Sequence, residues 1–504
     1  MQRTLIALAS GIVVALAFEP VAVAVLLPLG LAAFFWTLHQ ARIRHAALLG
    51  LAFGLGFMVT LLGWLRVIGT DAWLALSAFE SLYFVLFGIG AALVSRLPAW
   101  PLWTGVVWVG VEAIRGAWPM GGLTWGRVGF ASIDTPLQGW LPWLGTNGVG
   151  LVIATTSAGL VWLVLHARQH TRPAAAVGGG ILALVVLPVL LPSGLFTEQT
   201  GTARVAIVQG DVPGTGDDVL AHHREITRSH IDLTRDLAND IRSGAVPQPD
   251  FVLWPENATA VDPFRDPSIS TNLAEITELL AAPVVVGGIV DADDPAHVLN
   301  QGIVWHPGTG AGDRYTKHHP VPFGEYIPFR AAFGERNFGR LALVPRDMLA
   351  GTRTAPLRIG DLEVADVICF DVAYDDTVTA QVRNGAGLMM VQTSNAMFIH
   401  TGQIDQQWAI SRVRALETGR TVVVAAINGR SGVIGPDGEV ISEITPRTRD
   451  VLNQEVGIVR GTPPAMVIGP WLGRLATMGG VVATLIGFLT YRRAGTQRTD
   501  GEST

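Results

Sequence analysis

The chain has 504 residues, of which 15% are charged, and its mean hydropathy is +0.40. This composition is too apolar for an ordinary soluble enzyme and too polar for a bundle of membrane helices alone, so it predicts a membrane part joined to a soluble part. The formal net charge of −6 and the lack of long basic runs argue against a nucleic-acid partner. A single cysteine, Cys369, excludes an internal disulfide.

Apolar segments fill the first part of the chain, separated by short runs of Pro, Gly and charged residues. A helix needs about 20 apolar residues to cross a bilayer. The first segment is not expected to be a cleaved signal peptide, because similar segments follow it and Phe18-Glu19-Pro20 is a poor cleavage site. We therefore predict a membrane domain at 1–195 with seven spans, an eighth span at 466–490, and a disordered cytoplasmic tail at 491–504. The seven spans are expected at 4–18, 21–38, 46–65, 72–94, 99–115, 138–165 and 174–194.

The distribution of arginine predicts the orientation of these spans. Cytoplasmic loops carry an excess of basic residues. With the N-terminus inside, the opposite short loops carry only Arg66, Arg115 and Arg127, whereas the cytoplasmic pieces carry Arg3, Arg42, Arg44, Arg96, Arg168, Arg172, Arg492, Arg493 and Arg498. Seven spans then place residues 200–460 outside the cytoplasm, and the eighth returns the C-terminus inside.

The polar block at 200–460 alternates strand-like and helix-like runs, which predicts a layered α/β domain. Strands are expected at 203–209, 251–254, 283–290, 302–305, 362–370, 387–393 and 421–427, and helices at 217–242 and 403–419. The sequence Gly435-Pro436-Asp437-Gly438 predicts a turn between two further strands.

The lone cysteine ends an apolar run and is followed by Phe370 and Asp371. A free cysteine is usually a small buried hydrophobic residue. A thiol nucleophile needs a nearby base or cation to raise its thiolate fraction. Glu256 and Lys317 are the candidates for these two roles.

Glu256 and Lys317 can each be interpreted either as an ordinary surface residue or as part of an active site. Glu256 follows Leu253-Trp254-Pro255, where it is either a surface carboxylate or a buried general base with a raised pKa. Lys317 is either a solvated loop lysine or a group that stabilises a thiolate and an oxyanion. His318 and His319 follow it, but no second ligand cluster with metal-like spacing appears, so no metal site is expected.

Glu80, Glu112 and Arg115 are charged residues within the predicted spans. Glu80 is either functional, as intramembrane acids often are, or lies near a helix end and reaches out of the bilayer. Glu112 and Arg115 are one helical turn apart, which predicts an ion pair between them.

Three ordered segments, 253–256, 315–328 and 368–371, resemble the Glu-Lys-Cys motifs of the nitrilase (carbon–nitrogen hydrolase) superfamily. They read Leu-Trp-Pro-Glu, Tyr-Thr-Lys-His-His-Pro-Val-Pro-Phe-Gly-Glu-Tyr-Ile-Pro and Ile-Cys-Phe-Asp. The segment 322–328, together with the flanking spans, resembles one branch, the apolipoprotein N-acyltransferases of bacteria. Segments 125–130, 136–140 and 412–420 are also similar to that branch.

This resemblance implies an α-β-β-α sandwich on an eight-helix membrane base. It also implies a multi-pass protein of the bacterial inner membrane, with residues 200–460 extracytoplasmic and both termini cytoplasmic. The implied reaction is a ping-pong transfer of a fatty acyl group from a phospholipid to the N-terminal amine of a diacylglyceryl-cysteine on an apolipoprotein. No cofactor is implied, and a monomer is expected.

The resemblance also implies residue roles. Cys369 would carry the acyl group as a thioester, Glu256 would act as general base and then acid, and Lys317 would hold the oxyanion. Glu325 would support the geometry of Glu256 and Lys317, with Phe370 and Asp371 beside the nucleophile.

Two residues depart from the family pattern, and two other functions are open. The family usually has glutamate at the position of Asp371 and tryptophan at that of Met397, which bears on lipid preference. A membrane-tethered amidase or nitrilase that hydrolyses an external amide would share the three motifs. A non-enzymatic scaffold or transporter would have lost one of them. The segment 322–328 and the eight spans favour the acyltransferase.

Overall fold

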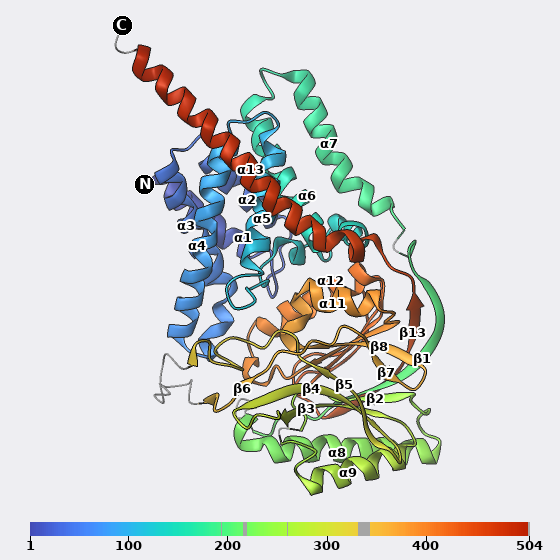
Figure 1. The fold of residues 1–504 in the computed structure, drawn as a ribbon. Helices are drawn as coiled ribbons and strands as arrows, with labels where there is room; N and C mark the ends of the chain where they lie inside the picture. The colour runs from blue at the N-terminus through green and yellow to red at the C-terminus, as the bar shows by residue number, and fades with distance from the viewer. Residues whose placement is uncertain (193, 215–218, 260, 331–342, 502–504) are drawn as a thin grey trace. The chain divides into compact units, whose positions relative to one another are not determined.

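The computed structural model describes residues 1–192, 194–214, 219–259, 261–330 and 343–501. The chain divides into two compact units, one of residues 1–193 with 467–504 and the other of residues 194–466. Figure 1 labels the helices and strands of both units.

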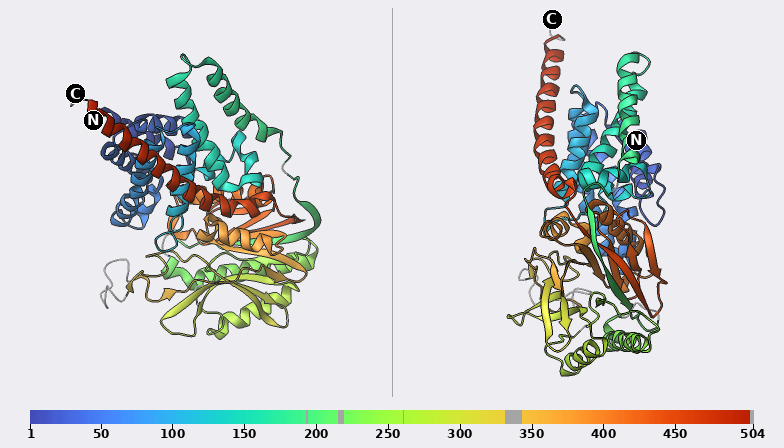
Figure 2. Two further views of the ribbon diagram at one scale, coloured as in Figure 1. Left: turned by 45° about the horizontal axis from the view of Figure 1, so that its top comes forward. Right: turned by 90° about the vertical axis from the view of Figure 1, so that its right-hand side faces the viewer.

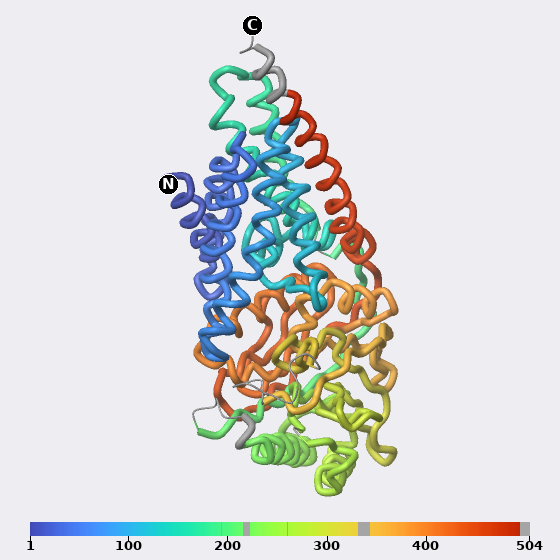
Figure 3. Tube along the Cα trace, turned by 60° about the vertical axis from the view of Figure 1, so that its left-hand side comes forward, coloured from blue at the N-terminus to red at the C-terminus, as the bar shows by residue number. Residues whose placement is uncertain are grey.

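The first unit is made of helices, one for each predicted span (Figure 3). Five helical segments are long and apolar enough to cross a membrane: Ile43–Leu61, Thr70–Val94, Pro136–His166, Thr171–Leu190 and Pro464–Arg493. The eight-span topology stays a prediction. The helices are α1 (Gln2–Ala15), α2 (Leu26–Leu38), α3 (Ile43–Leu61), α4 (Thr70–Val94), α5 (Trp100–Arg115), α6 (Leu141–His166), α7 (Thr171–Leu190) and α13 (Pro464–Gly501).

Helices α1 and α2 are shorter than the predicted spans because of the segment between them. Pro20 has no backbone N–H and disfavours a helical residue before it, so the chain turns between Ala15 and Leu26. Ala22 in this turn has a positive φ of 52°. The predicted boundaries at residues 18 and 21 are therefore wrong by a few residues.

The prediction of a disordered tail is wrong for residues 491–501. Helix α13 continues to Gly501. No proline follows Pro470 in this helix, and extending an existing helix costs far less free energy than starting one. The helix therefore runs on past the apolar segment.

The predicted Glu112–Arg115 ion pair is also wrong. Arg115 Nη1 lies 3.3 Å from Glu80 Oε2, and the same atom donates to the carbonyl oxygen of Trp125 at 2.8 Å. Glu112 Oε1 instead accepts a hydrogen bond from the backbone N–H of Val128 at 2.9 Å. Both Glu80 and Arg115 are buried, so the carboxylate of Glu80 joins α4 to α5 and does not reach toward a membrane surface.

The second unit is built on two β-sheets packed face to face. The first has the order β13-β1-β2-β3-β4-β5, with β6 beside β4, and the second has the order β12-β11-β10-β9-β8-β7. The strands of the first sheet are β1 (Glu198–Gln209), β2 (Phe251–Leu253), β3 (Val284–Asp291), β4 (His297–His306), β5 (Gly310–Thr316), β6 (Asp347–Met348) and β13 (Asp450–Arg460). Those of the second are β7 (Leu357–Ile359), β8 (Leu362–Ile368), β9 (Leu388–Thr393), β10 (Val422–Ala426), β11 (Ser431–Ile434) and β12 (Val440–Ile444).

Helices cover the outer face of each sheet (Figures 1 and 2). The first sheet packs against α8 (Val219–Ser243) and α9 (Pro267–Leu280), and the second against α11 (Asp375–Arg383) and α12 (Gln403–Thr418). The predicted α-β-β-α sandwich is confirmed.

The central strands are apolar on both faces because each face meets a different core. In β1 and β2, Val205, Ile207 and Leu253 belong to the core between the sheets, whereas Val208 and Val252 belong to the core under α8 and α9. Strands buried on both sides form continuous apolar runs, which is how the sequence revealed them.

Most predicted elements of this unit are present. The turn at 435–438 joins β11 to β12, and the predicted helix at 403–419 is α12. The predicted helix at 217–242 is α8, although residues 217–218 lie outside the described part of the chain. The predicted strand at 362–370 ends at Ile368, because Cys369 begins a short 3-10 helix, Cys369–Ala373. Strands β5 and β13 and helices α9 and α11 were not predicted.

Candidate active site

Parallel strands deliver three polar segments to the edges of the sheets. Strand β2 runs parallel to β1 and β3, and β9 runs parallel to β8 and β10. Glu256 follows β2, Cys369 follows β8, and Ser394 follows β9. The carboxyl ends of neighbouring parallel strands lie at one edge of a sheet, where sites usually form. The topology therefore accounts for the meeting of residues that are far apart in the sequence.

The carboxylate of Glu256 is buried and held from three sides. Its Oε1 accepts from Asn300 Nδ2 at 2.8 Å and lies 3.1 Å from Lys317 Nζ. Its Oε2 accepts from the backbone N–H of Ser394 at 2.9 Å. With the side chain only 3% exposed, these contacts replace the water that a surface glutamate would have.

Lys317 lies between two carboxylates. Its Nζ is 3.1 Å from Glu256 Oε1 and 2.7 Å from Glu325 Oε1, and the side chain is 1% exposed. Burial favours the neutral amine, but Glu256 and Glu325 outweigh it and raise the pKa of Lys317 well above its usual range. Lys317 is therefore a fixed cation of the site.

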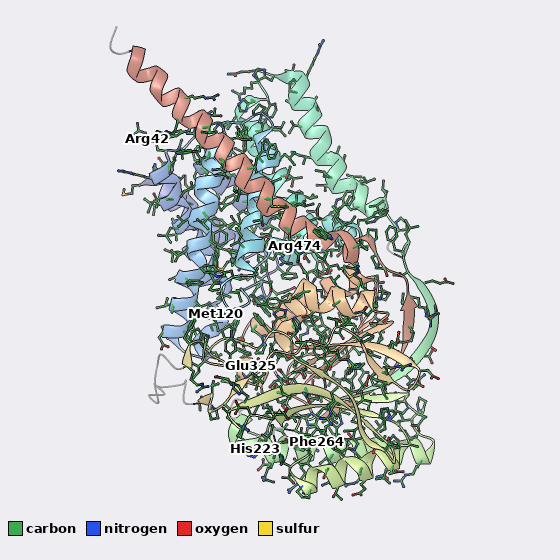
Figure 4. The ribbon with its side chains drawn as sticks, viewed as in Figure 1. Arg42, Met120, His223, Phe264, Glu325 and Arg474 are labelled. Carbon is green, nitrogen blue, oxygen red and sulfur yellow. The ribbon has the colours of Figure 1, made fainter. Side chains whose placement is uncertain are left out.

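Glu325 belongs to the segment that follows β5 and is labelled in Figure 4. Its Oε2 accepts from the backbone N–H of Val321 at 2.7 Å. Burial raises the pKa of Glu325, and the nearby charge of Glu256 adds to this, while Lys317 acts in the opposite direction. Glu325 therefore keeps a proton to higher pH than an exposed glutamate does.

The backbone of Cys369 has a positive φ of 51°, which is uncommon for a residue with a side chain and is typical of strained functional turns. Burial, together with the carboxylate of Glu256, raises the pKa of Cys369 to about 12, and Lys317 acts in the opposite direction. The thiol is therefore protonated at neutral pH, and its reaction as a nucleophile needs a base in the same step.

Asp371 holds the lysine-bearing segment against the cysteine turn. Its Oδ2 accepts from Tyr315 OH at 2.9 Å and from the N–H of His318 at 3.1 Å, and its Oδ1 accepts from the N–H of His319 at 2.7 Å. The shorter aspartate thus makes a complete set of contacts where the family usually has glutamate. Phe370 packs its ring edge-on to Tyr374, with centroids 5.1 Å apart.

The structure adds a third potential ligand to the two histidines. Asp376, from the first turn of α11, brings the donor atoms of His318, His319 and Asp376 within 4.8 Å of one another, a set that could hold a divalent ion. His319 Nε2 and Asp376 Oδ1 are 3.0 Å apart and form a hydrogen-bonded pair. This cluster could not be predicted from the sequence, because only the fold brings α11 beside this segment.

The sequence interpretation missed Asn300, Ser394 and Thr393. Asn300 is a polar residue within the apolar strand β4, and its side chain binds Glu256. Ser394 acts through its backbone N–H, which no side-chain motif would reveal. The hydroxyl of Thr393 lies beside the thiol of Cys369. Ser394 and Thr393 could have been found from the run of polar residues at the carboxyl end of the apolar strand β9.

This arrangement is suited to acyl chemistry through a thioester. It combines a protonated thiol, a buried carboxylate able to take the proton, and an ammonium group. Two of the three ammonium protons face Glu256 and Glu325. Within the described residues Lys317 has no other hydrogen-bond partner, so its third proton is left for an oxyanion.

Comparisons with known proteins agree with this geometry. Residues 10–159 match the family model described as apolipoprotein N-acyltransferase N-terminal domain, and residues 204–460 match the model described as carbon–nitrogen hydrolase. The apolipoprotein N-acyltransferase of Mycolicibacterium smegmatis is 33% identical over 505 residues, which cover 96% of this chain and 84% of that protein. This chain belongs to the apolipoprotein N-acyltransferase family.

Further apolipoprotein N-acyltransferases match over nearly their whole length. The Ralstonia nicotianae enzyme is 30% identical, covering 96% of this chain and 93% of that protein. The Photobacterium profundum enzyme is 24% identical, covering 98% and 96%. Among solved structures, Nit3 of Saccharomyces cerevisiae, a nitrilase superfamily member, matches 51% of this chain and 91% of its own, with a TM-score of 0.37 and 15% identity.

Proposed function

We propose that this chain transfers a fatty acyl group from a phospholipid to the N-terminal amine of a diacylglyceryl-cysteine on an apolipoprotein. The observation that carries the proposal is the buried Lys317, bonded to both Glu256 and Glu325 and acting electrostatically on the Cys369 thiol, in a chain of this family. No cofactor enters the reaction.

In the first half-reaction, Sγ of Cys369 attacks the carbonyl carbon of the acyl ester while Glu256 takes the thiol proton. Lys317 stabilises the negative charge that develops on the carbonyl oxygen. The ester C–O bond breaks, Glu256 passes the proton to the leaving glycerol oxygen, and a lysophospholipid departs. The acyl group remains on Cys369 as a thioester.

In the second half-reaction, the neutral amine of the acceptor attacks the thioester carbon. Glu256 removes a proton from the amine nitrogen and returns a proton to Sγ as the C–S bond breaks. An amide forms on the acceptor, and the thiol is restored. Glu256 therefore acts as base and acid in turn.

Apolar side chains around the site support a lipid substrate. Phe323, two residues before Glu325, is 49% exposed, and Met397, close after Ser394, is 45% exposed. A fatty acyl chain that reaches Cys369 could contact these two apolar side chains. An acyl chain lying over them would also limit the access of water to the thioester.

We further propose that the catalytic unit is extracytoplasmic, that both termini are cytoplasmic, and that the enzyme resides in the bacterial inner membrane as a monomer. The arginine distribution between the loops supports the orientation.

The test is the intact mass of the full-length protein after incubation with vesicles of one phosphatidylethanolamine of known acyl chains. We expect a mass gain of one acyl group that hydroxylamine removes and that is absent in Cys369→Ala. No adduct in the folded wild-type protein would contradict the proposal. Hydrolysis of soluble amides without any lipid would instead favour a membrane-tethered amidase, which shares the same three residues.

A further inference from the structure

The end of strand β9 touches both reacting groups of the site. The Thr393 hydroxyl lies beside the thiol of Cys369, and the N–H of the next residue, Ser394, donates to Glu256 Oε2 at 2.9 Å. The nucleophile and the general base are thus in contact with two consecutive residues. Their relative placement depends on what holds this turn.

One buried side-chain oxygen on helix α12, Oε1 of Gln407, accepts hydrogen bonds from the side chains of this turn. Gln407 Oε1 accepts from Asn395 Nδ2 at 2.7 Å, from Gln403 Nε2 at 3.2 Å and from Thr393 Oγ1 at 3.3 Å. All four side chains are buried.

The backbone of the turn needs such an anchor. Asn395 has a positive φ of 51°, a left-handed conformation that asparagine tolerates better than most residues but that still carries strain. Its side chain spans to α12, where it also donates to Gln403 Oε1 at 2.9 Å. The turn is therefore held in its unusual conformation by side-chain contacts to α12.

We propose that Gln407 is a positioning residue, whose carboxamide oxygen fixes the turn 393–395 so that Thr393 stays at the thiol and Ser394 N–H stays on Glu256. Gln407 touches neither substrate nor reacting atoms, and it acts through the turn. This inference rests on the proposed roles of Cys369 and Glu256.

The Nε2 group of Gln407 makes it possible to test the hydrogen-bonding role of Oε1 separately from the packing of the side chain. Its Nε2 has no hydrogen-bond partner among the described residues. It faces a small cavity whose lining includes Ser411, Val424 and Arg430. Replacing Nε2 by oxygen therefore preserves the acceptor that the turn uses. Replacing Oε1 removes all three contacts at nearly the same volume.

The experiment compares Gln407→Met with Gln407→Glu in the full-length protein in phosphatidylethanolamine vesicles. The rate of acyl-enzyme formation is followed by intact mass at several lipid concentrations. Misplacing catalytic groups by about 1 Å can cost a factor of about 100. We expect Gln407→Met to slow the chemical step about 10- to 100-fold with an unchanged half-saturating lipid concentration, and Gln407→Glu to stay within about 3-fold of the wild type.

Ser411→Ala is the matched control. Ser411 lies one turn further along α12, lines the same cavity and bonds only the backbone oxygen of Gln407. Its replacement is expected to leave the rate unchanged. Equal rates for Gln407→Met and wild type, or equally slow rates for the Met and Glu variants, would overturn the inference.

A second variant covers the case in which Gln407→Met does not fold. Asn395→Gly adopts the left-handed conformation without strain but removes the side-chain anchor, so we expect a similar slowing. A wild-type rate in this variant would contradict the role of the anchor.

The alkylation rate of Cys369 by iodoacetamide separates this inference from the proposed function. It needs no acyl donor, and displacement of the turn from the thiol should change it several-fold in Gln407→Met but not in Gln407→Glu. A wild-type protein that is never acylated would refute the acyltransferase proposal, while the alkylation rates would still decide the role of Gln407.

Discussion

Lys317 is an ammonium group with 1% exposure that shares its contacts between two carboxylates. A buried charge is tolerated only when its partners replace water, and removing one partner typically costs about 3–5 kcal/mol. Glu256, Glu325 and Lys317 must therefore be considered as one unit. After burial, their charges also influence the pKa of the neighbouring thiol of Cys369.

This coupling leads to a prediction for Glu256→Gln. After burial, the Glu256 carboxylate is the strongest influence that raises the pKa of Cys369, and Lys317 acts in the opposite direction. Neutralising Glu256 should therefore lower the thiol pKa below about 12. The pH dependence of Cys369 alkylation by iodoacetamide measures this shift.

The same variant should lose acyl transfer even though its thiolate is more accessible. A glutamine cannot accept the thiol proton, and loss of a general base costs about 100- to 10,000-fold in rate. Acylation slowed to this extent, together with a lowered thiol pKa, supports the assignment of Glu256 as the base. A raised thiol pKa, or unchanged acylation, would contradict it.

At the scale of elements, the two sheets are packed so closely that one strand position has no room for a side chain. A Cβ added to Gly302 of β4 would lie 1.9 Å from Asp366 Oδ2 and 2.5 Å from Gln392 Oε1. Gln392 in turn donates to the carbonyl oxygen of Trp254 at 2.6 Å, two residues before Glu256. The absence of a side chain at Gly302 thus leaves room for Asp366 and for the hydrogen bond of Gln392 to Trp254.

Gly302→Ala is therefore expected to destabilise the catalytic unit by about 1–3 kcal/mol, the usual cost of overpacking a core. The measurement is the urea midpoint for alkylation of Cys369, which reports unfolding of the catalytic unit. Gly201→Ala on β1 is the matched control, because an added Cβ there meets nothing within 4 Å. Similar midpoints for the two variants would show that the inter-sheet space is not limiting.

At the scale of the whole molecule, the chain joins an apolar helical unit to a two-sheet catalytic unit. The lone cysteine makes the topology directly testable, because Cys369→Ala leaves a protein without any thiol. Single cysteines can then be introduced at exposed positions on opposite sides of the predicted membrane.

Gln169→Cys, in the turn between α6 and α7, is predicted to face the cytoplasm, and Glu439→Cys, in the turn between β11 and β12, is predicted to face outside. Both positions are exposed in their own units. A membrane-impermeant maleimide should label only Glu439→Cys in right-side-out vesicles and only Gln169→Cys in inside-out vesicles. Labelling of both from one side would refute the proposed orientation.

Much of this protein was predictable from local patterns. Strands buried on both faces appear as apolar runs, so β1, β2, β8, β9 and β10 could be located directly. Glu256 and Cys369 stood out because each ends such a run. The three motifs then indicated the superfamily and its α-β-β-α sandwich, because residue types and their order along the chain are properties of the sequence.

Other elements could not be located from the sequence because their local pattern is weak. Strand β5 (Gly310–Thr316) is rich in glycine and charge, and β13 (Asp450–Arg460) mixes polar and apolar residues. They form because neighbouring strands supply hydrogen bonds, as when β13 pairs with β1 some 250 residues earlier, with Ala203 opposite Val456. Pairing at such separations depends on the fold.

The contacts that complete the site were decided only by tertiary structure. Asn300 reaches Glu256 from 44 residues away, and Ser394 reaches it from 138 residues away. In the helical unit, Arg115 pairs with Glu80, 35 residues away, although Glu112 is one turn from it. The sequence determined which groups can react and roughly where each segment ends. Which partners surround each buried charge depended on packing, because desolvation selects contacts by distance in space.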